Sequence, residues 1–391
     1  MDRTVYLDNA ATTMTDPRVV EAMLPYMYDM YGNASGKYSK GFEARKAVEE
    51  AREKVAHLIG AKSDEIYFTS GATEGNNMVF GENTWPVVIT PKTEHKSVLN
   101  AADAYSKRSR YISLGVDDEG FIFPDSLEEC LKDTYGKVID RSARIGNENK
   151  GLVSIMYTNN ETGTRQLIDL LTDSAHEYGY LFHTDAVQAL GHIKVNVKDD
   201  DIDYLTASGH KLYGPKGIGF IYIRRGLPLH ALMYGGEQEK GIRPGTENVP
   251  GIVGLGEACR IAEAEMHEYA LKERINSRLL RDALLKIPES RQNGTGDRIL
   301  NISFNGVNGQ SLAMRLDMEG ICVSTGSACS SGLDERSHVL VAMGLTAKEA
   351  DSSIRISLGK YNTVEEIEYA AAKISYLVEE LRFLSGEYPK A

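Results

Sequence analysis

The chain has 391 residues, of which 42% are hydrophobic and 26% charged, a composition typical of a globular protein large enough for about two domains. Its formal net charge is −12 and no run of Lys or Arg stands out, which argues against nucleic acid as a partner. The sequence shows no signal-peptide pattern and no run of the ~20 apolar residues that a membrane span needs, so we expect a cytoplasmic protein.

Short apolar runs alternate with longer helical patterns through the first two-thirds of the chain. Helices are predicted over residues 42–59 and 166–178. Strands are predicted at Glu65–Thr69, Pro86–Thr90, Leu152–Tyr157, Tyr180–Thr184, Tyr204–Ser208 and Gly217–Ile223. Brief, wholly apolar strands are typical of a mainly parallel sheet buried on both faces. The pattern therefore predicts an α/β domain that binds its ligand at the carboxyl ends of the strands.

The pattern changes near Pro250. A long helical stretch covers residues 252–287, and strand-like runs follow at Ile299–Phe304 and Ile354–Leu358. The last helix opens at Thr363 with a capping box, the arrangement in which a Thr and a Glu three residues later cap a helix start. We expect a second, C-terminal α+β domain.

A lysine and an aspartate follow two of the predicted strands. Lys211 stands directly after Tyr204–Ser208, before a Gly/Pro-rich turn, where a cofactor could bind it. Asp185 follows the strand Tyr180–Thr184 and could pair with a protonated ring nitrogen. Each residue also has an ordinary explanation, because loops commonly carry a lysine and an aspartate often caps a helix.

Two further segments add possible cofactor contacts. In Thr69–Glu74 a strand turns into a helix through small residues, so unpaired backbone N–H groups could bind a phosphate, and Thr73 could add a hydroxyl. Ser208 and His210 could add further donors. His95, at the start of a helix, could stack on an aromatic ring and transfer protons, although a lone surface histidine is common.

The four cysteines have no C-x-x-C spacing, so we expect neither a disulfide framework nor a metal site. Cys130, Cys259 and Cys322 lie within helical or apolar patterns and are expected to be unreactive. Cys329 lies in a run of small polar residues, as a mobile nucleophile requires.

Eight segments occur in the order found in a known family. They are SGATEGNN, KTEHKSV, NNETGT, HTDAVQ, SGHKLYGPKGIG, GIRPGTENVPGIVG, STGSACSS and IRISLGKYN. Together they closely resemble the cysteine desulfurases of the NifS and IscS class, and the likeness covers nearly the whole chain. The resemblance implies a fold-type-I enzyme dependent on pyridoxal 5′-phosphate, with a large domain over 15–255. Residues 1–14 and 256–391 would form the small domain, with the cysteine loop at about 323–336.

The resemblance also implies a role for each matching residue. Lys211 would carry pyridoxal phosphate, Asp185 would pair with its ring nitrogen, Gln188 would bond its phenolic oxygen and His95 would stack on the ring. The phosphate contacts would be Ala72, Thr73, Ser208, His210 and, from a neighbouring subunit, Thr246, which implies a homodimer. Asn160 and Arg355 would bind the carboxylate of L-cysteine, and Cys329 would take its sulfur as a persulfide.

The chain departs from the family pattern at Asn33–Tyr38, at an apparent insertion over residues 140–150, and at Glu237. These departures leave the sulfur acceptor open: it could be an iron–sulfur scaffold or a tRNA-thiolation factor. Two other functions also remain open, namely a selenocysteine lyase or related pyridoxal-phosphate enzyme, and a non-catalytic assembly platform.

Overall fold

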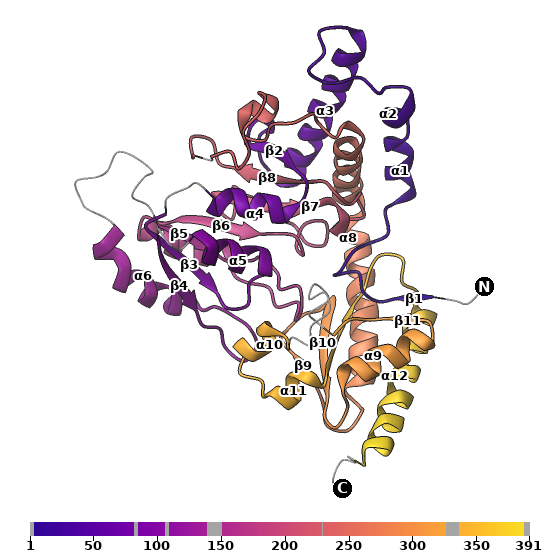
Figure 1. Cartoon of the computed structure of the whole chain (residues 1–391). Coiled ribbons are helices and arrows are strands. Elements are labelled where there is room, and N and C mark those ends of the chain that lie inside the picture. The colour runs from indigo at the N-terminus through magenta and orange to yellow at the C-terminus, as the bar shows by residue number, and fades with distance from the viewer. Residues whose placement is uncertain are drawn as a thin grey trace.

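A seven-stranded mixed sheet organises the first two-thirds of the chain (Figure 1). The computed structural model describes residues 4–81, 85–105, 109–138, 151–228, 230–325 and 336–386, with the side chains of 135–138 excepted. In spatial order the strands are β2 (Ile66–Thr69), β8 (Gly219–Ile223), β7 (Tyr204–Ser208), β6 (Leu181–Asp185), β5 (Leu152–Ser154), β3 (Val87–Pro91) and β4 (Arg110–Leu114). All neighbouring strands are parallel except β8, which runs antiparallel to both β7 and β2.

This topology places several chain ends at one edge of the sheet. Strands β2, β7 and β6 run in the same direction, so Thr69, Ser208 and Asp185 end at the same edge. Every residue of β6 and β7 is buried, as expected for central strands covered on both faces. The predicted mainly parallel sheet is confirmed.

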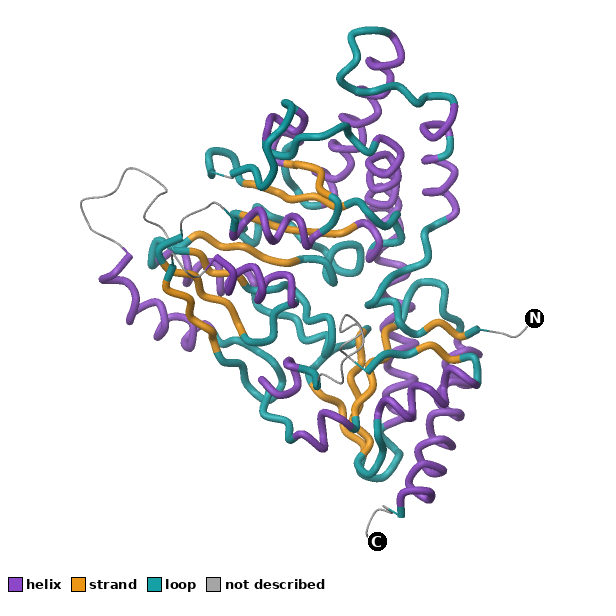
Figure 2. Tube along the Cα trace, viewed as in Figure 1, coloured by secondary structure: helices purple, strands orange, loops and turns teal. Residues whose placement is uncertain are grey.

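Helices surround the large sheet. They are α1 (Pro17–Met23), α2 (Pro25–Tyr28), α3 (Ser39–Leu58), α4 (Ala72–Phe80), α5 (Lys96–Tyr105), α6 (Pro124–Val138) and α7 (Ile168–Glu177). Short 3₁₀ turns occur at η1 (Ser63–Glu65), η4 (Gly209–Lys211) and η5 (Gln238–Gly241). Figure 2 shows the strands as two separate groups, each with helices packed around it.

The second group of strands forms the C-terminal part of the fold. An antiparallel sheet contains β12 (Ser353–Ser357), β10 (Ile299–Phe304) and β9 (Ser290–Asn293), and a parallel pair joins β1 (Val5–Tyr6) to β11 (Ile321–Cys322). The accompanying helices are α9 (Gly309–Met318), α10 (His338–Ala342), α11 (Ala347–Asp351) and α12 (Val364–Ser385). This group buries its own apolar cluster, which includes Leu300, Ile354 and Ile374. The N-terminal strand thus belongs with this part, whereas the boundaries at 14/15 and 255/256 stay a prediction.

Helix α8 (Val249–Leu284) connects the two groups of strands (Figure 1). Asn248 caps its start, and a proline follows in the first turn, where its missing N–H costs no hydrogen bond. The helix packs along α3 through small residues: a Cβ added to Gly256 would lie 2.7 Å from the Cα of Ala51. Close backbone contact therefore fixes how α8 lies against the large sheet.

Local sequence signals set the ends of other elements. The predicted capping box opens α12, because Thr363 accepts from the N–H of Glu366 while the Glu366 carboxylate accepts from the N–H of Thr363. The same helix ends at Gly386, whose φ of 70° suits glycine. Within the described ranges, no helix is both long enough and apolar enough to cross a membrane.

Candidate active site

A cavity of about 840 Å³ opens at the edge of the large sheet where β2, β6 and β7 end. The structure describes eleven of the twelve site residues predicted from the sequence, and ten of these line the cavity. Nine come from the first two-thirds of the chain: Ala72, Thr73, His95, Asn160, Asp185, Gln188, Ser208, His210 and Lys211. Arg355, from β12 of the small sheet, lines it as well. The fold therefore brings segments from nearly the whole chain to one place.

Lys211 ends the 3₁₀ turn η4 that follows β7, and its side chain reaches the cavity. Its Nζ donates hydrogen bonds to the backbone carbonyls of Ala10 and Ala11, the second at 2.8 Å. These carbonyls come from the segment after β1, so the amine lies between the two parts of the fold. The ordinary explanation, a lysine in a solvated loop, is wrong.

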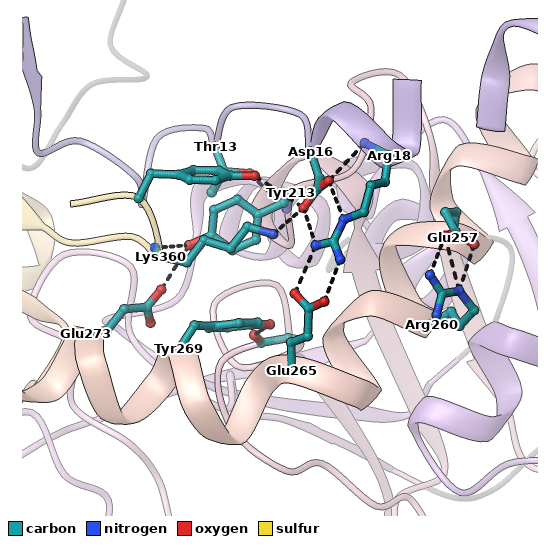
Figure 3. A network of polar contacts seen from close by, with 12 residues as sticks. Thr13, Asp16, Arg18, Tyr213, Glu257, Arg260, Glu265, Tyr269, Glu273 and Lys360 are labelled. Carbon is teal, nitrogen blue, oxygen red and sulfur yellow. Dashed lines mark hydrogen bonds and ion pairs between the residues drawn. The ribbon is translucent and has the colours of Figure 1, made fainter. Parts of the chain in front are cut away.

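A buried network of hydrogen bonds holds the backbone of the turn that contains Lys211. Nε2 of His192 donates to the carbonyl of Lys211 at 3.0 Å, and its Nδ1 lies 3.2 Å from the carboxylate of Glu273 on α8. The hydroxyl of Tyr213 donates to the same carboxylate at 2.9 Å and accepts from the backbone N–H of Lys360 at 2.7 Å (Figure 3). The lysine turn is thus tied to α8 and to the segment after β12.

Asp185 lies at the end of β6 and is 6% exposed. Its Oδ1 accepts from the N–H of Val187 at 3.0 Å, the local contact that a turn-capping aspartate makes. Its Oδ2 accepts from the amide of Asn76 at 2.9 Å, and the side chain also faces the cavity. Gln188 is close by, and its amide donates to the carbonyl of Ala10 at 2.9 Å. Asp185 therefore makes the local capping contact and also lines the cavity, whereas its pairing with a ring nitrogen stays a prediction.

The start of α4 forms a candidate phosphate site. The residue before Ala72 is Gly71, so no side chain caps the helix, and its first-turn N–H groups face the cavity. A Cβ on Gly219 would lie 2.7 Å from the Cα of Gly71, so glycine is needed for β8 to pass this close. Ser208, at the end of β7, lines the same corner.

Charges around this corner favour an anion. Burial, followed by the nearby Lys211 and Lys216, lowers the pKa of His210 to about 4, so its ring is neutral in this state. Burial alone would raise the pKa of Glu74, but hydrogen bonds from Arg243 and from Ser70 lower it below its usual value. Because Arg243 is paired with Glu74, Lys211 and Lys216 supply positive charge to this corner.

The substrate side of the cavity contains a guanidinium. Arg355 is 3% exposed; one of its terminal nitrogens pairs with Asp8 at 2.8 Å and the other donates to the carbonyl of Asn160 at 3.0 Å. Its Nε has no hydrogen-bond partner among the described residues. An unsatisfied charged donor at a cavity wall is suited to a carboxylate.

His95 and Glu94 occupy the loop between β3 and α5. Oε1 of Glu94 accepts from the N–H of Met156 at 2.5 Å, and burial raises the pKa of Glu94 well above its usual value. The carbonyl of Glu94 accepts from Nε2 of His338 at 2.9 Å. His338 begins α10, so this contact ties the segment that follows the predicted cysteine loop to the His95 loop.

The predicted nucleophile Cys329 and the insertion at 140–150 lie outside the described residues. Both flanks of the cysteine segment are described. Before it, Ser324 and Arg355 exchange backbone hydrogen bonds of 3.1 and 2.6 Å. After it, the hydroxyl of Ser337 donates to the carboxylate of Glu161 at 2.5 Å. The described residues on both sides of the segment are therefore hydrogen-bonded to residues that line the cavity, Arg355 on one side and Glu161 on the other.

The other three cysteines agree with the expectation that they are unreactive. Cys130 lies in α6, Cys259 is buried in α8 and Cys322 lies in β11. Burial raises the pKa of each thiol, which reduces the fraction present as reactive thiolate. Among the described residues, no group of three or more His, Cys, Asp or Glu could hold a metal ion.

Two features from the sequence lie away from the cavity. Thr246 is exposed and does not line the cavity of its own chain. Ala34 and Ser35, from the departing segment Asn33–Tyr38, line a separate hollow of about 670 Å³ together with Glu237. Neither feature acts on the active site from within one chain.

The residues present fit pyridoxal phosphate. An amine on Lys211, a carboxylate on Asp185 and an uncapped helix start at Ala72 surround one cavity, which is the donor set that this cofactor requires. The guanidinium of Arg355 adds a positive charge to the wall of the same cavity.

Sequence reasoning missed two polar residues that support this set, Asn76 and Ser97. Asn76 is fully buried in α4, four residues after Ala72, and Ser97 follows His95 by two residues. The sequence did contain a partial signal for Asn76, because residues four apart share a helix face and Ala72 was already placed at the site.

Comparison with known proteins agrees with this geometry. Residues 5–370 match the family model of the class-V aminotransferases. The chain is 44% identical over 398 residues to a protein named cysteine desulfurase IscS from Dictyoglomus turgidum, covering 98% of this chain and 97% of the relative. A solved NifS-like protein superimposes with a TM-score of 0.86 at 36% identity, covering 97% of this chain and all of that one. A structure of SspA in complex with cysteine gives a TM-score of 0.76 at 32% identity, with 92% and 100% coverage.

Proposed function

Because the chain belongs to the cysteine desulfurases, within the class-V aminotransferase family, we propose that it converts L-cysteine to L-alanine and takes the sulfur onto Cys329. The observation that carries the proposal is the meeting of Lys211, Asp185, His95 and Arg355 in one cavity. Bound pyridoxal phosphate supplies an electron sink that makes the substrate Cα–H acidic and its sulfur open to attack.

Residues of the chain bind and orient the substrate. The guanidinium of Arg355 would donate hydrogen bonds to the substrate carboxylate, with the side chain of Asn160 beside it. This fixes the amino group toward Lys211 and the sulfur toward the cavity mouth. The carbonyls of Ala10 and Ala11 hold Nζ of Lys211 within the cavity, where it can accept the α-proton.

The sulfur step needs a thiolate and a proton donor. The thiolate of Cys329 attacks the substrate sulfur, so an S–S bond forms while the bond between that sulfur and Cβ breaks. The electron pair of the broken bond stays with carbon, and the carbon is protonated to give alanine. His95 is the proposed donor and acceptor of protons around the sulfur.

The test separates the cofactor-binding lysine from the nucleophile. We expect Cys329→Ser to bind the cofactor with unchanged absorbance but to form no persulfide, since the lysine and the thiol lie on separate segments. Lys211→Ala should lose the absorbance band of the lysine-bound cofactor. Alanine formation and persulfide labelling with a thiol-reactive probe give the readouts. Full sulfide release by Cys329→Ser without added thiol would refute the role of Cys329.

The same assay addresses the alternatives. Comparing alanine release from L-cysteine and L-selenocysteine distinguishes a desulfurase from a selenocysteine lyase. A non-catalytic platform would release alanine from neither amino acid. The presence of both Lys211 and Cys329 argues against this alternative, because a platform has no catalytic need of either residue.

We further propose a cytoplasmic homodimer that passes sulfur to an acceptor protein. The exposed Thr246, outside the cavity of its own chain, supports a contact with the phosphate of a neighbouring subunit. Light scattering should give twice the chain mass, and Thr246→Ala should weaken cofactor binding without dissociating the dimer. Capture of the native protein with persulfide-bearing Cys329 would identify whether the acceptor is an iron–sulfur scaffold or a tRNA-thiolation factor.

A further inference from the structure

The side chain of Asn76 lies between two groups of the proposed reaction without reaching the cavity itself. It is completely buried in α4. Its amide nitrogen donates to Oδ2 of Asp185 at 2.9 Å and to Oγ of Ser97 at 2.8 Å. A carboxylate only accepts hydrogen bonds, so the nitrogen of the amide, not its oxygen, must face Asp185. The orientation of Asn76 is thereby fixed.

This orientation determines the direction of the next hydrogen bond. Oγ of Ser97 receives an N–H from Asn76, so its own hydrogen is available for Nδ1 of His95, 2.7 Å away. The backbone N–H of Ser97 donates to the same nitrogen at 3.1 Å. A backbone N–H cannot accept, so Nδ1 carries a lone pair and the neutral ring is protonated on Nε2.

The side-chain oxygen of Asn76 also has a hydrogen-bond partner, and this bond agrees with the same orientation of the amide. Its Oδ1 accepts from the hydroxyl of Thr206 at 2.5 Å. Nε2 of His183 lies 3.4 Å from that hydroxyl oxygen, and Oγ of Ser154 lies 2.8 Å from Nδ1 of His183. Burial lowers the pKa of His183 to about 3, so its ring is neutral and has one N–H to donate. All donors can therefore point one way along the chain, from Ser154 to His95.

The position of Asn76 argues for more than the satisfaction of buried polar groups. Asp185, Ser97 and His95 all line the cavity, on β6 and at the start of α5, whereas Asn76 does not. The amide of Asn76 thus hydrogen-bonds residues on two separate elements, β6 and α5. In the proposed function these elements must keep a fixed spacing around the cofactor ring. A group supported in this way keeps its productive geometry without reorganisation.

We propose that Asn76 is a positioning residue that holds Asp185 and His95 in a fixed mutual orientation, the second through Ser97, with His95 protonated on Nε2. This inference rests on the proposed function for the roles of Asp185 and His95. Asn76 acts through these residues and touches neither substrate nor cofactor.

The two branches can be separated by mutation. Asn76→Leu keeps the branching of the side chain and removes both N–H donors, whereas Ser97→Ala removes only the His95 branch and leaves the bond to Asp185. Asn100→Ala, on the exposed side of α5, is the matched control. Thermal unfolding of each variant checks the fold, and Ser97→Ala tests the His95 branch even if Asn76→Leu does not fold.

The first readout needs no cofactor. In cofactor-free protein labelled with ¹⁵N-histidine, with His95 assigned through His95→Gln, the unaltered protein should show Nε2 protonated and Nδ1 as a hydrogen-bonded acceptor. In both variants the Nδ1 signal should move toward that of an unbonded ring nitrogen. A proton on Nδ1 in the unaltered protein, or an unchanged signal in both variants, would overturn the proposal.

The second readout uses the holoenzyme. Asn76→Leu should shift the midpoint of the cofactor's absorbance titration by about half a pH unit or more, and Ser97→Ala should not. Both should lower kcat about 10- to 100-fold with KM nearly unchanged. An Asn76→Leu variant with an unaltered midpoint and kcat contradicts the inference. Absence of a lysine-bound cofactor band in the unaltered protein would refute the proposed function instead, and the ¹⁵N result would still stand.

Discussion

At the scale of single residues, the guanidinium of Arg355 is held by structural contacts and is proposed to bind the substrate as well. Its terminal nitrogens are held by Asp8 and by the carbonyl of Asn160, which orient the group, while Nε has no partner among the described residues. Lysine has the same charge but a single point of attachment, so it could satisfy Asp8 or a substrate carboxylate but could not reproduce the fork.

We therefore predict that Arg355→Lys lowers kcat/KM for L-cysteine about 10- to 100-fold, mostly through KM, since a hydrogen bond to a charged group contributes about 1.5–3 kcal/mol. Steady-state alanine formation measures the effect. Arg291→Lys, at an exposed arginine on β9 of the same sheet, should change neither constant. An Arg355→Lys enzyme with an unaltered KM would show that another group binds the carboxylate.

At the scale of elements, the contact between α3 and α8 depends on a residue without a side chain. Gly256 in α8 lies against the backbone of Ala51 in α3. The two backbones cannot easily move apart to make room for a side chain, because each is held in a helix. Close-packed interiors tolerate added volume poorly.

We predict that Gly256→Val lowers the free energy of unfolding by about 1–3 kcal/mol, the usual cost of overpacking. Urea unfolding followed by circular dichroism would measure the loss. Gly115→Ala is the control, because a Cβ at that position meets no atom within 4 Å. Equal stability of Gly256→Val and the unaltered protein would mean that the two helices can separate without cost.

At the scale of the whole molecule, one buried cation joins the N-terminal segment, α8 and the segment after β12. The ammonium of Lys360 lies 2.6 Å from Asp16 and 4.3 Å from the centre of the Tyr213 ring (Figure 3). Hydrogen bonds from Arg18 and then Lys360, against the opposing effect of burial, hold the pKa of Asp16 well below its usual value.

Asp16→Asn should therefore lower the stability by about 3 kcal/mol, since it leaves a buried ammonium without its countercharge. Because the folded-state pKa of Asp16 is depressed, its contribution is fully present above the unfolded value near 4 and is lost only in stronger acid. The deficit should thus be equal at pH 5 and pH 8 in urea unfolding. Glu257→Gln, which weakens the solvent-accessible pairs with Arg260 and Lys54, should cost less than about 1 kcal/mol. A deficit that changed between pH 5 and pH 8 would point to another titrating group.

How much the sequence predicted depended on how local each signal was. Tyr204–Ser208 and Ile299–Phe304 have the predicted bounds, because short buried strands are apolar throughout. Strand β4 was missed because it lies at the edge of the sheet and is largely exposed. The run Leu152–Tyr157 was predicted too long: β5 ends at Ser154, where the chain leaves the sheet toward the cavity.

How well the site residues could be predicted also depended on how local each signal was. Lys211 and Asp185 could be predicted as residues of the cavity, since Asp185 ends β6, Lys211 lies in the turn after β7 and both match family motifs. The bond between Asn76 and Ser97 could not, because the two residues lie on different helices that meet only in the folded protein. The pairing of Arg355 with Asp8 likewise joins positions 347 residues apart.

The backbone exchange between Ser324 and Arg355 has a consequence for delivery of sulfur. Ser324 precedes Cys329 by five residues, and an extended chain covers at most about 3.5 Å per residue. In the proposed function, the Cα of Cys329 can therefore lie at most about 17 Å from that of Ser324, whose backbone is bonded to the strand that carries Arg355. An acceptor of the sulfur would have to bring its receiving atom close to that range.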